Sequence, residues 1–452
     1  MNSSSVLGKL CHLMYYFQHY SNILNALMTI NQHAPSFYAA TANPQPERAV
    51  LQGRRDADIC VVGAGYTGLS SALHLAEAGF KVLVVEAAKV GWGASGRNGG
   101  QIVHSYSRDI DVIEKSYGPQ VAAAMGNMAF EGARVIRERV AKYNIQCDLK
   151  DGGIYAAKTQ KKVAGLHEHK ELWEKYDSLK MQIVEGAEIQ NYVKTDQYKA
   201  LLIDPTGGHI HPLNLALGEA TAFESLGGII FEQSPVTNIN RGETAVVKTA
   251  QGEVHAKFVI IACNAYIGDL EPKLSAKAMP CGTQVIATAP LVNWQDVLPT
   301  DHCVEDTNYL LDYYRLTADK RLIFGGGVVY GAKDPADIDA HIRPNLEGTF
   351  PQLKGVKFDY AWTGNFLLTL SRLPQVGRLE NNIYYAQGCS GHGVTYTHMI
   401  GRVLSEAIRG QTERFDVFAK LPHYPFPGGR LFRVPFSALG ALWYDIRDRL
   451  GV

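Results

Sequence analysis

The sequence predicts an α/β protein, α+β overall, in which a parallel-sheet domain is interleaved with a second domain built on a mostly antiparallel sheet. Three observations support this prediction. Residues 58–86 follow the order strand, glycine-rich turn, helix and strand, and a second glycine cluster comes directly afterwards at residues 91–101. Residues 283–330 are typical of successive antiparallel strands, which belong to a different kind of sheet.

Length and composition indicate how many domains the chain can form and which classes of partner it can bind. A chain of 452 residues is long enough for two or three domains, or for one large interleaved unit. Apolar residues make up 46% and charged residues 19%, which is typical of a well-packed globular protein. Lys+Arg and Asp+Glu are equal at 44 each, so the chain lacks the cationic excess on which nucleic-acid binding depends. We therefore expect no nucleic-acid partner.

Cysteine usage and hydropathy indicate the compartment. The seven cysteines are scattered and form no CxxC pair, which argues against a disulfide framework and a structural zinc site and favours a reducing compartment. No apolar run reaches the roughly 18 residues that cross a bilayer, so we expect no transmembrane segment and a cytoplasmic location. Residues 1–35 lack a clean signal-peptide pattern and are expected to be a loosely attached extension.

The first structural unit follows a linker at residues 44–57. Residues 58–62 (DICVV) predict a short buried strand, and residues 66–79 predict a helix with Leu69, Ala72, Leu73 and Ala76 on one face. Residues 81–86 (KVLVVE) predict a second buried strand. Strand, helix and strand within about 30 residues form a βαβ unit with a parallel strand pair.

The turn between this strand and helix carries a phosphate-binding pattern, GxGxxG, which consists of Gly63, Ala64, Gly65, Tyr66, Thr67 and Gly68. Gly63 allows the tight turn, Gly65 lets backbone N–H groups approach a pyrophosphate, and Gly68 lets the helix lie close to the strand. Glu86 ends the next strand, where a carboxylate can accept hydrogen bonds from ribose hydroxyls and would repel a 2′-phosphate. The pattern predicts a Rossmann-like domain that binds NAD or FAD rather than NADP.

The second glycine cluster, residues 91–101 (GWGASGRNGGQ), favours FAD over NAD. An NAD dehydrogenase has no need of such a segment at this position. In a flavin enzyme the chain must return along the pyrophosphate and reach the isoalloxazine ring. Glycines expose backbone donors there, and polar side chains of the cluster can bind phosphates or flavin carbonyls.

The rest of the chain alternates between segments typical of the parallel-sheet domain and segments typical of the antiparallel sheet. Residues 109–145 are expected to be mostly helical, and residues 258–262 (FVIIA) form another buried strand that ends at the turn Cys263-Asn264-Ala265. Antiparallel strands are expected at TQVIAT, NYLLDYYRL and RLIFGGGVVY within residues 283–330. A short strand at 383–387 precedes the turn GCSGHGV, and a helix is expected at 393–408.

On these motifs the sequence resembles the D-amino-acid-oxidase-like family of FAD oxidoreductases, which includes glycine oxidase, sarcosine oxidase and D-amino acid dehydrogenase. The resemblance covers nearly the whole chain after residue 36 and is carried by VVGAGYTGLSSALHLAEAGFKVLVVEA (61–87), GASGRNGGQ (93–101), GGHIHP (207–212), VIIACNAY (259–266) and GCSGHGV (388–394). Longer stretches resemble the branch of that family that oxidises gamma-glutamylputrescine: SFYAATAN (36–43), SYSRDIDVIEKSYG (105–118), GTQVIAT (282–288), NYLLDYYRLTADKRLIFGGGVVYGA (308–332), WTGNFLLTLSRLPQVGRL (362–379) and LPHYPFPGGR (421–430).

The resemblance implies which residues hold the cofactor. It implies that Gly63, Gly65, Gly68 and Glu86 bind the ADP half of FAD, that Ser95, Gly96, Arg97, Asn98, Gly99 and Gly100 line the flavin side, and that Val236 meets the adenine through its backbone. It also places Gly388, Gly391, Gly393 and Val394 at the pyrimidine end of the flavin. Sarcosine oxidases anchor FAD through a cysteine in the segment that resembles 362–377, and this chain has none there. We therefore expect non-covalent FAD.

The resemblance also implies a division into alternating domains. The expected parts are an N-terminal extension and linker (1–55), the FAD-binding domain (56–150, 201–270 and 361–415), the substrate domain (151–200 and 271–360) and a C-terminal tail (416–452). The implied reaction is oxidation of a primary amine, with hydride transfer to the flavin, hydrolysis of the imine and reoxidation by O2 with release of hydrogen peroxide.

Candidate residues for this chemistry lie in 309–315 (YLLDYYR). On a strand, Tyr313 and Arg315 share one face, and Asp312 and Tyr314 share the other. Arg315 is suited to pair with a glutamyl carboxylate of the substrate, or with a structural carboxylate. The candidate catalytic residues are Tyr314, Arg315 and His392; the candidate substrate-binding residues are Tyr313, Arg315, Trp362 and Asn365. His392 is a candidate because it lies in the flavin-facing turn, although it also suits a structural role, as does Trp362.

Several alternatives stay open at this level. His209, His211, His398, His423 and the cysteines form no coherent ligand set, so no metal is expected. Another enzyme of the family, such as a D-amino acid dehydrogenase that passes electrons to a membrane quinone, fits the same motifs. So does a flavin-binding protein without turnover, whereas the second glycine cluster argues against an NAD dehydrogenase. The sequence fixes neither the oligomeric state nor the residue that activates oxygen.

Overall fold

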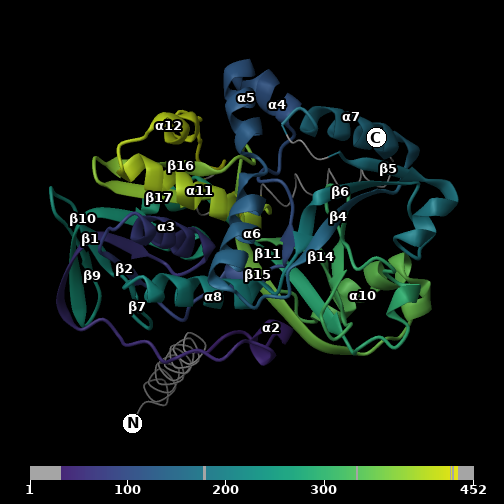
Figure 1. Ribbon diagram of the computed structural model, residues 1–452, viewed down its shortest axis with the longest axis horizontal. Coiled ribbons are helices and arrows are strands. Elements are labelled where there is room, and N and C mark those ends of the chain that lie inside the picture. Colours follow the sequence, from purple (N-terminus) through teal and green to yellow (C-terminus); the bar gives the residue numbers. More distant parts are fainter. Residues whose placement is uncertain (1–31, 177–179, 332–333, 428, 430–431, 436–452) are drawn as a thin grey trace, which may run out of the picture.

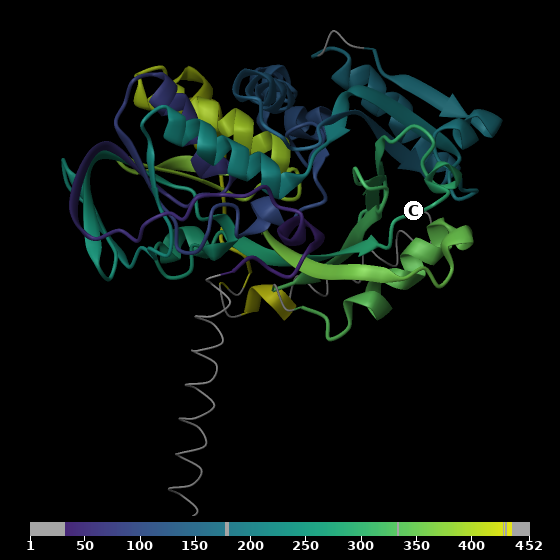
Figure 2. The same cartoon turned by 60° about the horizontal axis from the view of Figure 1, so that its bottom comes forward.

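The computed structural model describes residues 32–176, 180–331, 334–427, 429 and 432–435. Most of the expected extension at 1–35 and much of the expected tail at 416–452 lie outside these residues. Within them the strands form two sheets. Figure 1 shows the first sheet with α3 and α11 in one half of the molecule and the second sheet with α7 and α10 in the other, with α6 between the two halves. Figure 2 shows the two halves from a second direction.

The first sheet is mainly parallel. Its strands are β1 (Gly53–Val62), β2 (Val82–Val85), β7 (Ile229–Phe231), β8 (Asn238–Asn240), β9 (Ala245–Lys248), β10 (Gly252–Ile261), β16 (Gln375–Glu380) and β17 (Ile383–Gln387). The central order is β17-β10-β1-β2-β7, with every neighbouring pair parallel. This is the βαβ arrangement that the first motif predicts.

The second sheet is mostly antiparallel. Its strands are β3 (Gln101–Ile102), β4 (Lys150–Ala157), β5 (Gln182–Glu185), β6 (Ala200–His209), β11 (Ala278–Thr288), β12 (Cys303–Asp306), β13 (Tyr313–Leu316), β14 (Leu322–Tyr330) and β15 (Phe358–Thr369). β12 and β4 pair in parallel, and the other paired strands are antiparallel. β6 and β15 belong to this sheet, although the expected boundaries at 201 and 361 gave most of their residues to the FAD-binding domain.

The helices cover both sheets. They are α2 (Phe37–Ala40), α3 (Tyr66–Glu77), α4 (Ile110–Tyr117), α5 (Pro119–Met128), α6 (Glu131–Tyr143), α7 (Gln160–Trp173), α8 (Pro212–Ser225), α9 (Pro272–Ser275), α10 (Ile338–Thr349), α11 (Gly393–Ile408) and α12 (Glu413–Ala419). Short 3-10 turns occur at η1 (Ala94–Gly96), η2 (Gly186–Asn191), η3 (Asn264–Tyr266), η4 (Trp294–Asp296) and η5 (Pro351–Leu353). None of the helices within the described residues is long and apolar enough to cross a membrane.

The continuous apolar runs of the first sheet are explained by burial on both faces. In β1, Ile59 and Val61 pack into one apolar cluster, while Cys60 and Val62 pack into another on the opposite side. Alternate side chains of a strand point to opposite faces, so a strand covered on both faces needs apolar residues at every position. β1 also begins at Gly53, earlier than the predicted strand at 58–62, because its exposed polar start pairs with the first residues of β10.

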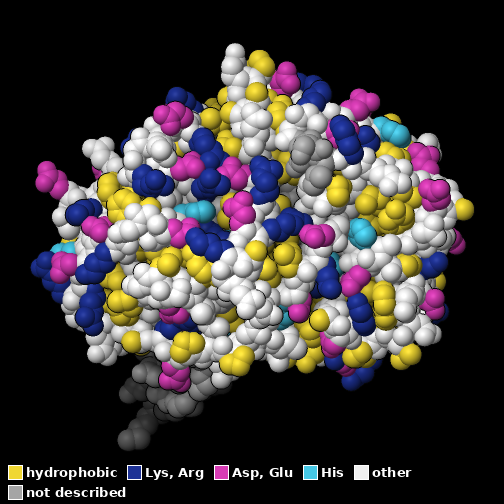
Figure 3. Space-filling view, viewed as in Figure 1, with side chains coloured by type: hydrophobic (Ala, Val, Ile, Leu, Met, Phe, Trp, Pro, Cys, Tyr) yellow, Lys and Arg dark blue, Asp and Glu magenta, His cyan; other side chains and the backbone are white. Residues whose placement is uncertain are grey.

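The expected strand at 308–316 is shorter in the structure. β13 begins only at Tyr313, and residues 307–312 form bends and an irregular segment instead. Charged side chains of both signs are mixed across the face shown in Figure 3, as the equal numbers of acidic and basic residues lead one to expect.

Candidate FAD site

A cavity of about 420 Å³ lies at the carboxyl ends of the parallel strands. Ligands of open α/β sheets bind at this edge, and a cavity of this size is within the range of cofactor sites. Its walls come from the turn after β1, the end of β2, the second glycine cluster, η3 and the start of α11. The lining residues include Gly63, Gly65, Tyr66, Thr67, Glu86, Trp92, Ser95, Asn98, Val236, Cys263, Asn264, Tyr266, Phe366, Gln387, Cys389, Gly391, Gly393 and Val394.

The turn after β1 has the geometry of a phosphate-binding loop. Gly63 has φ +106°, and a Cβ there would lie 2.8 Å from the Ala262 carbonyl oxygen. A Cβ on Gly68 would lie 1.9 Å from the Gly63 carbonyl oxygen, so only glycine lets α3 pack this closely on the strand. α3 begins at Tyr66, in the cavity wall. The free N–H groups and dipole of its first turn therefore favour an anionic pyrophosphate in the cavity.

Glu86 lies where the sequence predicts, directly after β2 in the cavity wall. Its Oε2 accepts from the Ala64 N–H at 2.7 Å, and its Oε1 accepts from the Ala88 N–H at 2.8 Å. Burial raises the pKa of the carboxyl group, although these backbone hydrogen bonds oppose the shift. Each carboxylate oxygen has a further lone pair, so Glu86 can still accept hydrogen bonds from ribose hydroxyls.

The second glycine cluster presents two polar side chains to the cavity. Ser95 Oγ accepts from the Tyr66 N–H at 2.9 Å, which ties this segment to the start of α3. Asn98 Nδ2 donates to the Ser95 carbonyl at 2.9 Å, while its Oδ1 accepts from the Gly100 N–H at 2.8 Å. Both side chains line the cavity. The cluster is thus folded by its own polar groups beside the phosphate-binding loop.

Arg97 does not line the cavity. Its Nε donates to the Trp92 carbonyl at 2.8 Å, and its guanidinium lies 4.4 Å from the centre of the Trp92 ring. Gly96 also packs internally, since a Cβ there would lie 2.3 Å from the Gly91 carbonyl oxygen. The described structure therefore gives Arg97 and Gly96 a role in shaping the segment and no direct position in the cavity wall.

Gly99 and Gly100 pack against the second sheet. A Cβ on Gly99 would lie 2.5 Å from the Tyr313 ring, and a Cβ on Gly100 would lie 2.8 Å from Arg315 Nη2. Tyr313 and Arg315 therefore share the face that the strand pattern predicts. This face packs against the glycine segment, and neither Tyr313 nor Arg315 is among the residues that line the cavity.

The expected substrate role of Arg315 is not supported by this position. Arg315 is 3% exposed, and its Nε donates to the Gly99 carbonyl at 2.6 Å. Its Nη1 donates to the Leu316 carbonyl at 3.1 Å and its Nη2 to the Tyr38 hydroxyl at 3.1 Å. Because the guanidinium already donates hydrogen bonds to three oxygen atoms of the protein, Arg315 supports the glycine segment. Arg315 therefore has partners within the protein, as the second expectation proposed, but these partners are carbonyl oxygens and a hydroxyl, not a carboxylate.

The position of Tyr314 also does not support the expected catalytic role. Its side chain points to the opposite face of β13, is fully buried, and stacks on Phe324 with ring centres 5.5 Å apart. Its hydroxyl pairs with the Tyr198 hydroxyl at 2.8 Å. It belongs to the apolar cluster between the second sheet and α10, away from the cavity. The alternation of a strand separated Tyr314 from Arg315, and the sequence did not indicate which face meets the cofactor.

His392 and Trp362 do not line the cavity, but each binds a neighbouring backbone segment. His392 Nδ1 donates to the His104 carbonyl at 2.8 Å, while its neighbours Gly391 and Gly393 line the cavity. Trp362 Nε1 donates to the Arg97 carbonyl at 2.9 Å, and its side chain is buried. Both residues therefore position segments that touch the cavity.

Asn365 and Gly388 lie next to lining residues. Asn365 is on β15 beside Phe366, and Gly388 precedes Cys389. The Gly388 N–H donates to Asn264 Oδ1 at 3.1 Å, which links the turn before α11 to η3. Val236, Gly391, Gly393 and Val394 all line the cavity.

The sequence motifs did not single out the residues of η3 as part of the site. Asn264 and Tyr266 line the cavity, together with Cys263 just before them. They follow β10, and ligands meet the carboxyl ends of parallel strands, so the turn after residues 258–262 carried a usable signal.

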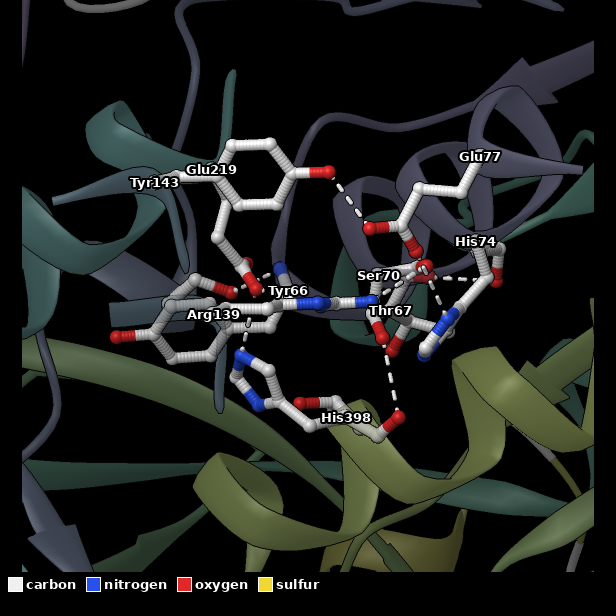
Figure 4. Close-up of polar contacts among 12 residues, drawn as sticks. Tyr66, Thr67, Ser70, His74, Glu77, Arg139, Tyr143, Glu219 and His398 are labelled. Atoms are coloured by element: carbon white, nitrogen blue, oxygen red, sulfur yellow. Dashed lines mark hydrogen bonds and ion pairs between the residues drawn. The ribbon is translucent and has the colours of Figure 1, made fainter. Parts of the chain in front are cut away.

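A buried polar network stands behind the phosphate-binding loop (Figure 4). Arg139 Nη1 on α6 donates to Glu219 Oε1 on α8 at 2.6 Å, and His398 Nε2 on α11 lies 3.1 Å from the same oxygen. The Tyr66 and His398 ring centres are 5.0 Å apart. Burial opposes ionisation of Glu219, but the charges of His398 and Arg139 outweigh it and lower the pKa of the carboxyl to about 2.

Ser70 completes this network from α3. Its Oγ donates to the His398 carbonyl at 3.0 Å, and Arg139 Nη2 donates to the Ser70 carbonyl at 3.1 Å. Helices α3, α6, α8 and α11 are thus tied together by charged and polar groups. Because α3 and α11 both begin at the cavity, this network fixes the two helix N-termini relative to each other.

Comparison with known proteins agrees with this geometry. The FAD dependent oxidoreductase family matches residues 58–407. The chain is 58% identical over 426 residues to the gamma-glutamylputrescine oxidoreductase of Escherichia coli, covering 94% of this chain and 100% of that protein. It is 40% identical over 427 residues to a probable oxidoreductase, OrdL, of Haemophilus influenzae, covering 92% and 98% of the two chains.

A solved structure shows the same fold. The glycine oxidase from Geobacillus kaustophilus superposes with a TM-score of 0.68 at 20% identity, covering 82% of this chain and 99% of that chain. The predicted fold class is therefore confirmed, and so is the predicted use of FAD, which the family match requires. With a family match that spans most of its length and a cavity whose walls suit a dinucleotide, the chain belongs to the FAD-dependent oxidoreductase family.

Proposed function

We propose that this chain oxidises the primary amine of gamma-glutamylputrescine. The substrate, O2 and water would give gamma-glutamyl-gamma-aminobutyraldehyde, ammonia and H2O2. The observation that carries the proposal is the 58% identity, over the whole length of the relative, to the gamma-glutamylputrescine oxidoreductase of Escherichia coli. The cavity lined by the phosphate-binding loop, Glu86 and the start of α11 supports the flavin part of the proposal.

The residues of the chain would hold and orient the cofactor. Bound FAD supplies the hydride acceptor and the reaction with oxygen. The N-terminus of α3 would bind the pyrophosphate, Glu86 the ribose, and the N-terminus of α11 would stabilise negative charge at the pyrimidine end. A free primary amine has a pKa of about 10, so the amine must lose a proton before oxidation. Removal of water around the amine lowers its pKa and favours the neutral form.

The direct test is an anaerobic mix of the purified yellow protein with gamma-glutamylputrescine, followed by air. We expect the flavin absorbance to bleach and then to recover with release of H2O2. Bleaching by D-amino acids but not by this amine would favour the D-amino acid dehydrogenase or oxidase alternative. Bound flavin that no amine or amino acid bleaches would indicate a flavin-binding protein without turnover. Recovery with a quinone or dye but not with air would contradict the use of O2.

The FAD is expected to be bound without a covalent link. Cys263 and Cys389 both line the cavity, but burial raises the pKa of both thiols, to about 12 for Cys263. A thiol becomes a good nucleophile only as the thiolate, so neither cysteine is poised to bond the flavin. Precipitation with trichloroacetic acid should leave the yellow colour in the supernatant. Flavin that stays in the pellet would contradict this prediction, and a Cys389→Ser variant would then identify the attachment point.

Replacement of Arg315 tests the structural role that we propose for it. An Arg315→Ala variant loses the support of the Gly99 carbonyl, so we expect less bound FAD and a lower stability. Among molecules that retain FAD, KM should change by the same factor for gamma-glutamylputrescine and for plain putrescine, which lacks the carboxylate. An increase in KM for gamma-glutamylputrescine alone would restore the carboxylate-binding role.

A cytoplasmic location is part of the same proposal. The cysteines within the described residues are all free, as in proteins of reducing compartments. A small-molecule amine and O2 are the expected reaction partners. The division into an FAD-binding domain and a substrate domain is likewise proposed, with β6 and β15 assigned to the second sheet.

A further inference from the structure

Three potential metal ligands meet outside the FAD cavity. They are His104, after β3, Asp109, at the start of α4, and His169, on α7. One ligand atom from each residue lies within 4.8 Å of the other two. None of the three lines the cavity. No sequence pattern groups them, because α4, α5, α6 and β4 separate His169 from the other two residues.

Two ring nitrogens of this cluster lack hydrogen-bond partners. His104 Nδ1 and His169 Nε2 are enclosed, and neither has a partner within the described part of the chain. An enclosed polar atom without a partner costs about 1–3 kcal/mol. An ion bound within the cluster would satisfy the more deeply buried of them, His104 Nδ1, in a residue that is 5% exposed.

His169 and Asp109 already face each other in this cluster. His169 Nδ1 lies 3.3 Å from Asp109 Oδ1, so one ion between these two atoms could bind both of them. The neutral imidazole ring offers one lone pair to such an ion. A neutral imidazole is the form that binds metal ions.

We propose that His104, Asp109 and His169 bind one divalent transition-metal ion of the Zn²⁺ class. Two imidazoles and one carboxylate are a ligand set that Zn²⁺, Co²⁺ and Ni²⁺ accept, whereas Mg²⁺ and Ca²⁺ prefer oxygen ligands. In a tetrahedral site with bonds of about 2.0–2.1 Å, ligand atoms lie roughly 3.4 Å apart, so the three groups would close by about 1 Å. A water molecule would fill the fourth position.

The surroundings favour a small ion over a larger ligand. The Trp173 ring stacks on His104 with centres 4.4 Å apart, and the Tyr155 ring lies 5.0 Å from that of His169. These aromatic walls leave little room beside the nitrogens. The Asp109 side chain is 51% exposed, which gives an ion a route from solvent.

The position connects the site to the flavin side of the molecule. His392 Nδ1 donates to the His104 carbonyl, and His392 precedes the first residue of α11, which lines the cavity. A bound ion would therefore join α7 and the start of α4 to the segment that supports the N-terminus of α11. We expect its main effect to be stabilisation of this junction.

The test uses untagged holoenzyme, dialysed against a chelator and then titrated with ZnCl2. The variants are His169→Gln and Asp109→Asn, and the matched control is His167→Gln, an exposed histidine two residues away on the same helix. We expect one Zn²⁺ per chain by elemental analysis in the wild type and the control, and a Kd at least about tenfold higher in each variant. Zn²⁺ should also raise the Tm of the wild type and the control but of neither variant.

The outcomes separate the proposal from a failure to fold. The flavin-to-protein ratio reports whether each variant is folded, and Asp109→Asn is the milder change because its side chain is partly exposed. Absence of stoichiometric binding to the wild type would overturn the proposal. Equal binding by the wild type and both folded variants would do the same, since the ion would then be bound elsewhere.

Discussion

A Gly65→Val variant is expected to purify without FAD. Gly65 lines the cavity directly before α3, and a Cβ there would already lie 3.0 Å from Ser95 Oγ. The rest of the valine side chain would extend into the space where the pyrophosphate must approach the backbone. We expect the affinity for FAD to fall at least about 100-fold, which corresponds to about 2.7 kcal/mol. The ratio of flavin absorbance to protein absorbance and a titration of apoprotein with FAD would measure this loss.

The control for this prediction is Gly165→Val. Gly165 lies on the exposed side of α7, where an added Cβ would meet nothing within 4 Å, so the same chemical change should leave FAD binding intact. Gly65→Ala should give a smaller loss than Gly65→Val, because it adds only the Cβ. A Gly65→Val protein that purifies with one FAD per chain would refute the phosphate-binding role of this loop.

Gly65 is a better probe than the other glycines of the loop. A Cβ on Gly68 would lie 1.9 Å from a backbone oxygen, and Gly63 has a positive φ that disfavours any side chain. Substitution of either residue would disturb the packing of α3 on β1 and so reduce stability as well as cofactor binding. At Gly65 the backbone is in an ordinary extended conformation, with φ −83°, and the main effect falls on the ligand.

A Glu219→Gln variant is expected to lose about 3 kcal/mol of unfolding free energy near pH 7. Glu219 is fully buried and is the acid that Arg139 and His398 share, so its neutralisation leaves buried positive charge without a partner. Denaturation with urea, followed by circular dichroism at a fixed FAD concentration, would measure the loss. The matched control is Glu138→Gln, an exposed position on α6 next to Arg139, for which little change is expected.

The pH dependence gives this prediction a second test. The folded pKa of Glu219 is about 2, below the value of 4.5 for an unperturbed glutamate. A group whose pKa is lowered by folding stabilises the protein above its unfolded pKa, and this contribution is lost as the pH falls through the folded pKa. The difference between wild type and Glu219→Gln should therefore be full above pH 4.5 and shrink between pH 4.5 and 2. A difference that stays constant across this range would contradict the assigned ionisation.

The sequence by itself determined the parts that depend on local patterns. The GxGxxG turn, Glu86 and the strand and helix at 383–387 and 393–408 all lie where their patterns predict. Glycine positions and apolar periodicity express steric limits of the nearby backbone, so they can be recognised without knowledge of the fold. The family resemblance added the prediction that Val236 and the turn before α11 contact the cofactor.

Only the tertiary structure decided the roles of residues whose partners are far away in the chain. Alternation on the strand placed Arg315 and Tyr314 on opposite faces, but the fold set Arg315 behind the glycine segment and Tyr314 in the core against α10. The pairing of Arg139 with Glu219 and the meeting of His104 with His169 join helices and loops that no local pattern connects. The physical reason is that charge partners and cavity walls are set by the packing of whole elements, and packing depends on contacts between segments distant in sequence.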